Sequence, residues 1–296
     1  MAIEKSILDK LKNKAKQSGK PFQLYLQLFC QEEFLRRLSK SIYIDNLILK
    51  GGLFIYTLTK FESRATIDVD FLLCKMSNEI KDLQYAIEEI IYVNTGNNYI
   101  KFEALGYEEI SPQRKYKGIS FQLIGTIGNT KTPFNVDIGV GDIISPKPQI
   151  LDIPTQLDGF ETPTVKAYSV ESTIAEKIEA ILQRMELSSR MKDFYDIYYL
   201  ANQFSFDSTK LQNAVVKTLE NRKTKYSLES MESVRKLSDN MQLQKLWKEF
   251  LKRTKLVKVD FNTALDVIYK LLNPIIVAKN DLSSKWNNRN CMWRKR

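Results

Sequence analysis

Apolar residues near the start of the chain recur every three or four positions, which is the spacing of an amphipathic helix. The pattern covers residues 3–40 and breaks at a Gly-Lys-Pro sequence at residues 19–21, so it predicts two helices. Further along, Gly51 and Gly52 precede a short apolar run that predicts a helix beginning at the glycines. Residues 65–73 are rich in β-branched and apolar side chains and predict a buried strand.

The rest of the chain changes from a mixed pattern to a helical one. Residues 79–92 predict a helix, and three later runs predict strands, at 99–110, 118–127 and 134–140. Four prolines between residues 146 and 163 disfavour helices and central strands and predict a linker there. From Ser169 the pattern is helical almost to the end, except near residues 202–208 and 226–227. The last residues, Ser283 to Arg296, are polar and basic, which predicts that they fray or bind an acidic surface.

This order of elements predicts an α+β fold in two lobes. Residues 1–150 would form a small mixed-sheet lobe with N-terminal helices, and residues 165–296 would form an α-helical bundle. Two lobes also agree with the length of 296 residues, because single cores stop growing at roughly 250 to 300 residues.

Composition narrows the class of protein. The chain is 43% apolar and 27% charged, and no stretch approaches the roughly 18 apolar residues of a membrane span, so we expect no membrane partner. Its start is charged and helix-periodic and does not resemble a secretory signal, so we expect a cytoplasmic protein.

The residue types present also exclude several kinds of chemistry. The chain has no histidine, which excludes Ser-His-Asp and Cys-His catalysis and every histidine metal site. Its 3 cysteines are widely spaced and predict neither a disulfide framework nor structural zinc. The formal charge of +10 favours a polyanionic partner such as a nucleotide or nucleic acid, although a basic protein can also be merely soluble.

Two aspartates in the predicted strand are the first candidate for chemistry. Residues two apart on a strand point to the same face, so Asp68 and Asp70 project side by side while Ile67, Val69 and Phe71 point into the opposite layer. Two neighbouring carboxylates stay charged only beside a compensating charge, such as Mg²⁺ or a lysine. The alternative is a pair of aspartates at a solvated sheet edge.

The glycine pair ahead of this strand is the second candidate. Glycines that open a helix let backbone N–H groups approach phosphate oxygens, and the helix N-terminus favours the anion. Alone, Gly51 and Gly52 could simply form a tight turn. Together with a short helix and a strand that carries hydroxyl-x-Asp-x-Asp, they predict a phosphate site next to a metal site.

Two further segments complete a set of four motifs in fixed order. The motifs are Leu49-Lys50-Gly51-Gly52, Arg64-Ala65-Thr66-Ile67-Asp68-Val69-Asp70-Phe71, Ala175-Glu176-Lys177, and Arg190-Met191-Lys192-Asp193-Phe194-Tyr195-Asp196. The set resembles the AbiEii/AbiGii toxin family of nucleotidyltransferases, which belongs to type IV toxin–antitoxin systems and abortive infection, a form of phage defence. Thr66 stands where many members have serine.

The resemblance implies a metal-dependent nucleotidyltransferase that uses an NTP as donor. It implies that Asp68 and Asp70 hold Mg²⁺ or Mn²⁺, that Asp137 is a third metal ligand on a later strand, and that Lys177 and Asp193 are catalytic. Gly51, Gly52, Thr66 and Lys177 would contact the nucleotide. The family further implies an RNA acceptor such as the end of a tRNA, and a separately encoded antitoxin that neutralises the toxin.

The helical segments allow other interpretations of the same residues. Lys177 falls at the border of the apolar stripe of residues 171–185, where a lysine can reach solvent. Arg190 and Asp193 could form only an intrahelical ion pair. Tyrosines at 195, 198 and 199 could stack on a base or pack in a core. Basic residues of the helical lobe could line an RNA groove or cover a solvated face; they are Lys217, Arg222, Lys223, Lys225, Lys252, Arg253, Lys255 and Lys258.

Taken together, these features predict an enzyme that binds NTP·Mg²⁺ in a cleft between two lobes and transfers a nucleotide to an acceptor hydroxyl. Lys177 would offset charge on the leaving pyrophosphate. Two other functions use the same residues. One is a nucleotide- or nucleic-acid-binding regulator without turnover, and the other is a metal-dependent nuclease.

Overall fold

The structure is a computed structural model that describes residues 2–110, 118–277 and 283–295. The chain divides into two compact units, each described by itself below. The first unit contains Met1–Gly141 and Gln149–Tyr168, and the second contains Asp142–Pro148 and Ser169–Arg296. The chain therefore passes into the second unit, returns to the first, and leaves it again.

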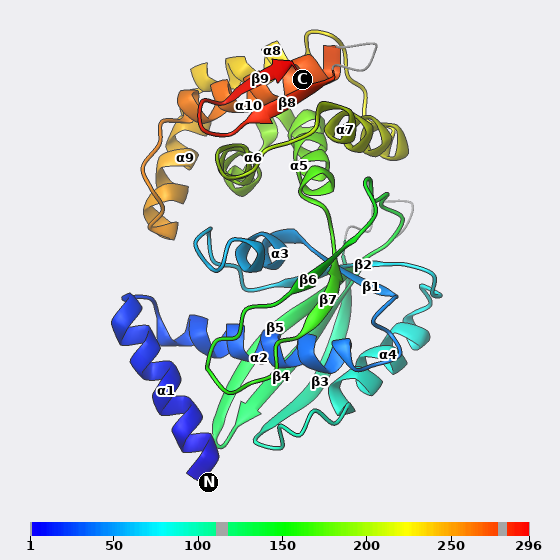
Figure 1. The fold of residues 1–296 in the computed structure, drawn as a ribbon, viewed down its shortest axis with the longest axis vertical. Coiled ribbons are helices and arrows are strands. Elements are labelled where there is room, and N and C mark those ends of the chain that lie inside the picture. Colours follow the sequence, from blue (N-terminus) through cyan, green and yellow to red (C-terminus); the bar gives the residue numbers. More distant parts are fainter. Residues whose placement is uncertain (1, 111–117, 278–282, 296) are drawn as a thin grey trace. The chain divides into compact units, whose positions relative to one another are not determined.

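The described residues of the first unit form a seven-stranded mixed sheet with the order β3-β4-β5-β2-β1-β7-β6 (Figure 1). The strands are β1 (Leu47–Lys50), β2 (Val69–Leu73), β3 (Ile100–Ile110), β4 (Gly118–Ile127), β5 (Thr130–Gly139), β6 (Gln149–Asp152) and β7 (Thr164–Ala167). β2 lies between β5, to which it is parallel, and β1, to which it is antiparallel. A strand with neighbours on both sides has its backbone hydrogen bonds satisfied on both edges, which suits the apolar run of β2.

The described part of the first unit also contains four helices, of which α2 and α4 pack against the sheet and against each other. The helices are α1 (Ala2–Ser18), α2 (Phe22–Ser39), α3 (Gly51–Leu58) and α4 (Ile80–Tyr92). The sequence predicted all four, with the break between α1 and α2 at the expected glycine and proline. α3 packs on β1 and β2, and therefore holds its N-terminus beside these two strands.

Charged side chains are buried within α2. Arg36 pairs with both Glu32 and Glu33, and Arg37 also pairs with Glu33. All four side chains are buried. A buried charge is tolerated only when it is paired and hydrogen-bonded. Arg37 also donates to the backbone oxygen of Ile100, 2.9 Å away, so the cluster joins the helix to the start of β3.

The proline-rich segment is not a plain linker, contrary to the sequence prediction. It contains β6 and β7, and β7 occupies an interior position between β1 and β6. The prolines that disfavour a strand lie outside these two short segments, at 146, 148, 154 and 163. β7 forms because β1 offers an unpaired edge. Just after β7, the backbone N–H of Tyr168 donates to the oxygen of Leu49 on β1 at 2.9 Å.

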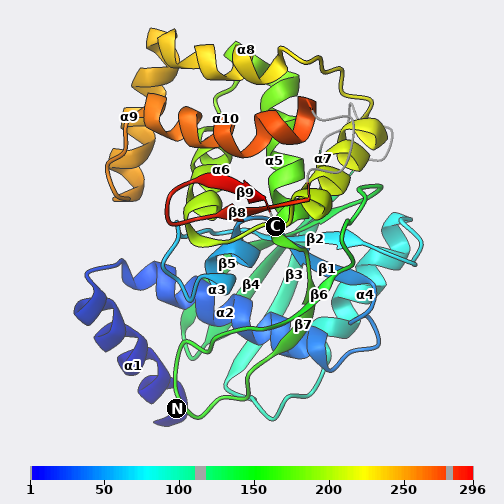
Figure 2. The same cartoon turned by 45° about the horizontal axis from the view of Figure 1, so that its top comes forward.

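The second unit is helical, with α10 packing on α6, α7 and α8, and α5 packing on α6 and α7 (Figure 2). Its helices are α5 (Val170–Arg184), η1 (Met185–Leu187), α6 (Met191–Gln203), α7 (Ser208–Arg222), α8 (Ser230–Lys236), η2 (Leu237–Asp239), α9 (Met241–Thr254) and α10 (Phe261–Val277). Side-chain oxygens cap three of them: Ser169 accepts from the backbone of α5, Asp207 from that of α7 and Asn240 from that of α9.

The described C-terminal residues 283–295 are ordered against the helices, so the interpretation that they fray is wrong, whereas binding of an acidic surface stays a prediction. They form a hairpin of β8 (Ser284–Asn287) and β9 (Met292–Lys295), whereas Arg296 lies outside the described residues. Trp286 is fully buried and donates from Nε1 to the oxygen of Ala201 at 2.7 Å. One tryptophan side chain can bury enough apolar area to hold a short hairpin against the helices.

The predicted fold class is confirmed. The chain is α+β, with a mixed sheet in its N-terminal part followed by a helical C-terminal part.

Candidate active site

Gly51 is the first residue of α3 and directly follows β1. Its φ of +69° lies in the left-handed region, which side chains with a Cβ rarely adopt. A Cβ at this position would overlap the carboxylate of Asp70. A Cβ on Gly52 would lie 2.7 Å from Thr66 Oγ1 and 3.4 Å from Arg64 Nη1. The two glycines therefore let the start of α3 approach the segment that carries the predicted aspartates.

Strand register places four polar residues in one row across the sheet. Lys50 of β1 is opposite Asp70 of β2, Asp70 is opposite Asp137 of β5, and Asp137 is opposite Ser120 of β4. Residues in register on neighbouring strands project from the same face of a sheet. Asp70 and Asp137 are half-buried, whereas the next residue on β2, Phe71, is fully buried on the opposite face.

Contacts within this row orient its side chains. Ser120 Oγ donates to Asp137 Oδ1 at 2.6 Å. The Nζ of Lys50 lies 5.5 Å from the ring centroid of Tyr168, and 3.5 Å from the point where a Cβ on Gly139 would stand. The ammonium group thus lies near Tyr168 and near Gly139, two residues beyond Asp137 on β5. The sequence predicts a compensating charge, Mg²⁺ or a lysine, and Lys50 is the lysine in register with Asp70.

Asp68 lies immediately before β2, because the strand is shorter than predicted and begins at Val69. Asp68 and Asp70 are both half-buried, and the intervening Val69 is fully buried, so the alternation of the strand extends back to Asp68. The prediction that Ile67 points into the opposite layer is wrong, since its side chain is 55% exposed. The backbone oxygen of Ile67 accepts a hydrogen bond from Gln31 Nε2. At this point a side chain therefore supplies the hydrogen bond that a neighbouring strand would supply within the sheet.

The donor set suits a magnesium ion held together with a nucleotide. Mg²⁺ commonly binds one or two carboxylates plus substrate phosphates and water; Asp70 supplies one carboxylate beside the start of α3, and Asp68, two residues before it, offers a second. Among the residues that the structure describes, no group of three or more acidic or thiol side chains is arranged to hold a metal ion by itself. The role of Asp137 as a third ligand stays a prediction.

In the second unit, Lys177 of α5 is buried between two aspartates of α6. Its Nζ lies 3.1 Å from Asp193 Oδ1 and 2.6 Å from Asp196 Oδ2, and the side chain is only 10% exposed. The interpretation in which Lys177 reaches solvent is therefore wrong. The side chain extends toward α6, which packs on α5, and two motifs that are separate in the sequence are joined by ion pairs.

Asp193 is also held by Arg190, whose Nε lies 2.6 Å from Oδ2. The side chain of Asp193 is 2% exposed. Burial alone would raise its pKa, but the cations of Lys177 and Arg190 outweigh burial and lower the pKa of Asp193 to about 2. The carboxylate is therefore charged at neutral pH. The intrahelical pair considered from the sequence exists, and it is part of a larger network.

A second buried network centres on Arg222 of α7. Its guanidinium lies 2.8 Å from Asp142, 3.4 Å from Glu176 and 2.5 Å from Glu179. Burial would lower the pKa of Arg222, but these three carboxylates raise it above its ordinary value. The sequence suggested an RNA-groove role for Arg222, and the structure places its side chain in an internal cluster instead. Its partners are scattered along the chain, so no sequence pattern announced them.

The tyrosines of α6 divide between core and surface. Tyr195 is buried and packs against Trp247 and Phe250, with ring centroids at 6.2 Å and 5.8 Å, so it belongs to the core. Tyr198 and Tyr199 are half-buried, and Tyr199 stacks on Tyr195 at 6.1 Å.

Within the described residues, no helix combines the length and the apolar character that a membrane span requires.

A family model described as "Nucleotidyl transferase AbiEii toxin, Type IV TA system" matches residues 33–267. None of the curated protein sequences matches the chain.

Solved structures also match the chain, at low sequence identity. JHP933 from Helicobacter pylori is 14% identical with a TM-score of 0.45, over 83% of this chain and 88% of that one. A candidate nucleotidyltransferase from H. pylori is 14% identical with a TM-score of 0.42, over 83% and 91%. An antigenic nucleotidyltransferase-like protein from Paracoccidioides brasiliensis is 18% identical with a TM-score of 0.39, over 69% and 95%.

Proposed function

The chain belongs to the AbiEii family of nucleotidyltransferase toxins of type IV toxin–antitoxin systems, and from this premise we propose that it transfers a nucleotide from NTP·Mg²⁺ to an RNA acceptor such as a tRNA. Membership of the family implies an NTP as substrate and an antitoxin as partner. The identity of the acceptor and the need for a metal ion belong to the proposal.

The observation that carries the proposal is the close approach of Gly51 to Asp70. A Cβ at Gly51 would overlap the carboxylate of Asp70, and Asp70 is in register with Lys50 and Asp137. Backbone N–H groups at the start of α3 thus lie next to carboxylates that can share an ion with a triphosphate. Structural turns and solvated aspartates do not require this proximity.

Each part of this arrangement has a proposed role. The N–H groups of Gly51 and Gly52 bind phosphate oxygens, because the first N–H groups of a helix have no intrahelical acceptor and favour an anion. Thr66, which lies against Gly52, offers a hydroxyl to the same phosphates. Bound at Asp68 and Asp70, Mg²⁺ would offset the charge of the triphosphate.

The transfer itself is an in-line displacement at the α-phosphorus. The oxygen of the acceptor hydroxyl forms a bond to this phosphorus, the bond to pyrophosphate breaks, and the hydroxyl proton passes to a carboxylate of the row, for which Asp137 is proposed. In the second unit, Lys177 is proposed to offset charge on the leaving pyrophosphate. Asp193 orients Lys177 through their ion pair, and Arg190, with a side chain 44% exposed, adds a second cation to this network.

Label transfer tests the proposal directly. The protein is incubated with each α-³²P-labelled NTP, Mg²⁺ and total RNA, and label is measured in RNA and in protein. We expect labelled, lengthened RNA from the wild type and none from Asp68→Ala. Asp82→Asn is the matched control, because Asp82 is an exposed aspartate of α4 in the same unit, and it should transfer as well as the wild type.

The same experiment separates the two rival functions. A binding regulator without turnover predicts no label with any NTP. A nuclease predicts shortened RNA in the absence of NTP. Either result would overturn the proposed transfer, and label found only in protein would overturn the RNA acceptor while leaving nucleotidyl transfer in place.

A further inference from the structure

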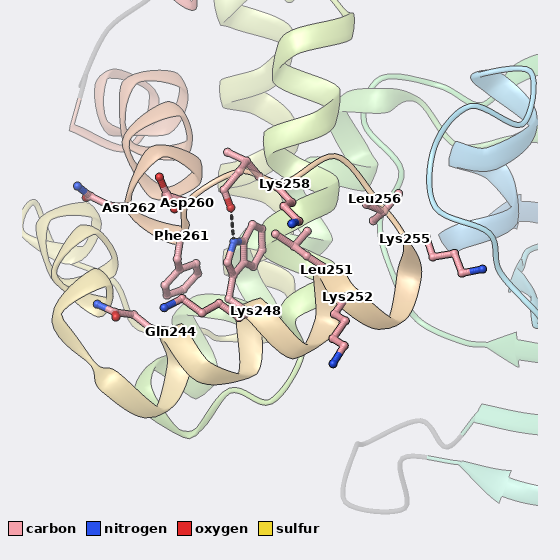
Figure 3. A pocket seen from close by; sticks show the side chains of 12 residues that line it. Gln244, Lys248, Leu251, Lys252, Lys255, Leu256, Lys258, Asp260, Phe261 and Asn262 are labelled. Carbon is pink, nitrogen blue, oxygen red and sulfur yellow. Dashed lines mark hydrogen bonds between the residues drawn. The ribbon is translucent and has the colours of Figure 1, made fainter.

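The second unit contains a hollow of about 910 Å³ that the active-site residues do not line. Its walls come from α9 and from the loop that leads into α10 (Figure 3). The volume is within the range of pockets that bind small molecules or single nucleotides.

Four lysines surround this hollow. Lys248 and Lys252 lie four residues apart on α9, Lys255 is the C-cap residue that directly follows the helix, and Lys258 stands on the loop. Helical residues four apart lie on one face, about 6 Å apart along the axis, so Lys248 and Lys252 are neighbours on α9. All four side chains are exposed, whereas the lining includes one carboxylate, that of Asp260. These four lysines, called the lysine ladder below, therefore concentrate positive charge on the rim of the hollow.

The floor of the hollow is apolar. Trp247, Leu251 and Phe261 are buried there, and Leu256 is half-buried at the side. Trp247 Nε1 donates to the oxygen of Val259 at 2.7 Å, as drawn in Figure 3, and this bond ties the loop to α9. The hollow is therefore shaped by bonds within the unit.

We propose that this hollow binds single-stranded RNA, with phosphates at the lysine ladder and a base over the apolar floor. Proteins that bind single strands combine a positively charged groove with apolar surfaces on which bases rest. The amide side chain of Asn262, exposed at the rim, and the carboxylate of Asp260 can pair with the polar edge of a base. An acidic peptide would use the lysines but, with carboxylate side chains alone, would leave the apolar floor uncovered. The identification with the acceptor rests on the proposed function.

Salt dependence of RNA binding tests the lysine ladder. An unstructured twelve-nucleotide RNA with a fluorescent label is titrated with the full-length protein by anisotropy, without NTP or Mg²⁺, at salt concentrations from 50 to 200 mM. Each phosphate contact on a single strand contributes about 0.7 to the slope of log K against log salt. For Lys248→Gln/Lys252→Gln we expect a slope smaller by about 1.4. Between 50 and 200 mM salt, the factor by which the Kd of the variant increases should therefore be about 7-fold smaller than the factor for the wild type.

The matched control neutralises two other lysines of the second unit. Lys210 and Lys217 are exposed on α7 and outside the hollow, so Lys210→Gln/Lys217→Gln changes the net charge equally and should keep the slope of the wild type. Leu256→Gln tests the apolar side of the hollow, and it should weaken binding several-fold without changing the slope. An unchanged slope in Lys248→Gln/Lys252→Gln, or an equal decrease in the control, overturns the proposal. So does displacement of the RNA by poly-glutamate as effectively as by unlabelled RNA, which would indicate a site for acidic peptides.

The binding assay also separates this inference from the proposed function. If the wild type labels RNA but Lys248→Gln/Lys252→Gln binds RNA with the slope of the wild type, the hollow is not the site and nucleotidyl transfer stands. If RNA is never labelled but the slope decreases as expected, transfer to RNA is wrong and the RNA site stands.

Discussion

Replacing Lys177 by methionine removes the cation that joins α5 to α6. Lys177 Nζ is 3.1 Å from Asp193 and 2.6 Å from Asp196, and both aspartate side chains are at most 2% exposed. Methionine fills a similar volume but leaves these carboxylates without the ammonium group. Breaking a buried pair by removing one partner costs about 3 to 5 kcal/mol, because the remaining charge is buried without compensation. Natural proteins have free energies of unfolding of about 5 to 15 kcal/mol, so this loss is large.

The expected shift in melting temperature follows from this free energy. For a unit of this size, 1 kcal/mol corresponds to about 3 °C, so Lys177→Met should melt about 9 to 15 °C below the wild type at pH 7.5. The difference in melting temperature between Lys177→Met and the wild type should become smaller at pH 4.5, because Asp193 without Lys177 can take up a proton and cease to be a buried charge. In the wild type the pKa of Asp193 is lowered to about 2, so its contribution to stability is present above about pH 4 and is lost only as the pH falls toward 2.

Thermal unfolding followed by circular dichroism measures these shifts. Lys217→Met, an exposed lysine of α7, is the control and should change the free energy of unfolding by less than about 0.5 kcal/mol. Adding Asp193→Asn and Asp196→Asn to Lys177→Met should restore part of the lost stability. If Lys177→Met melts with the wild type at pH 7.5, the ion-pair network described above is wrong. Loss of nucleotidyl transfer in Lys177→Met supports a phosphate role only at temperatures where the variant is folded.

Three further predictions concern the glycine turn, the second ion-pair network and the metal. Gly51→Ala should abolish label transfer, because its Cβ would overlap Asp70. Gly19 has the similar φ of +67° with nothing within 4 Å of an added Cβ, so the control Gly19→Ala should only lose about 1 kcal/mol of stability. Equal activity of the two variants would contradict the proposed packing. Arg222→Gln should destabilise the protein by about 3 kcal/mol in urea unfolding, because Asp142 and Glu179 lose their buried cation, and a change below 0.5 kcal/mol, roughly that of a surface substitution, would contradict this account. Removing divalent ions with EDTA should stop label transfer and added Mg²⁺ should restore it, and transfer that persists in EDTA would exclude the proposed role of the metal.

Most elements with a strong pattern could be predicted from the sequence, and those defined by tertiary pairing could not. The helices up to residue 92 and the strands from 100 to 139 follow apolar periodicity and turn residues. β7 is four residues long and lies among prolines, and it becomes a strand because β1 offers a partner. The C-terminal hairpin depends on the burial of Trp286, and a single tryptophan in a polar, basic segment gives no periodic signal.

The candidate site shows the same division. The sequence predicts the paired aspartates, Asp68 and Asp70, and the glycine turn, because each is a local pattern. The register that sets Lys50 and Asp137 beside Asp70 depends on how three strands pair, which the sequence does not state. The burial of Lys177 could not be predicted, because a helical projection of α5 contains no information about Asp193 and Asp196 on α6.

The order in which the first sheet is completed has a consequence for synthesis of the protein. β1, β2 and β5 have all left the ribosome once residue 139 has emerged, but β7, which covers the outer edge of β1, is made only at residues 164–167. Until then the nascent chain exposes a strand edge with unmet backbone hydrogen bonds, a template for pairing with other chains. A nascent chain released early, at residue 150, would keep every carboxylate of the row and both glycines yet retain this open edge, so an aborted translation product is expected to aggregate.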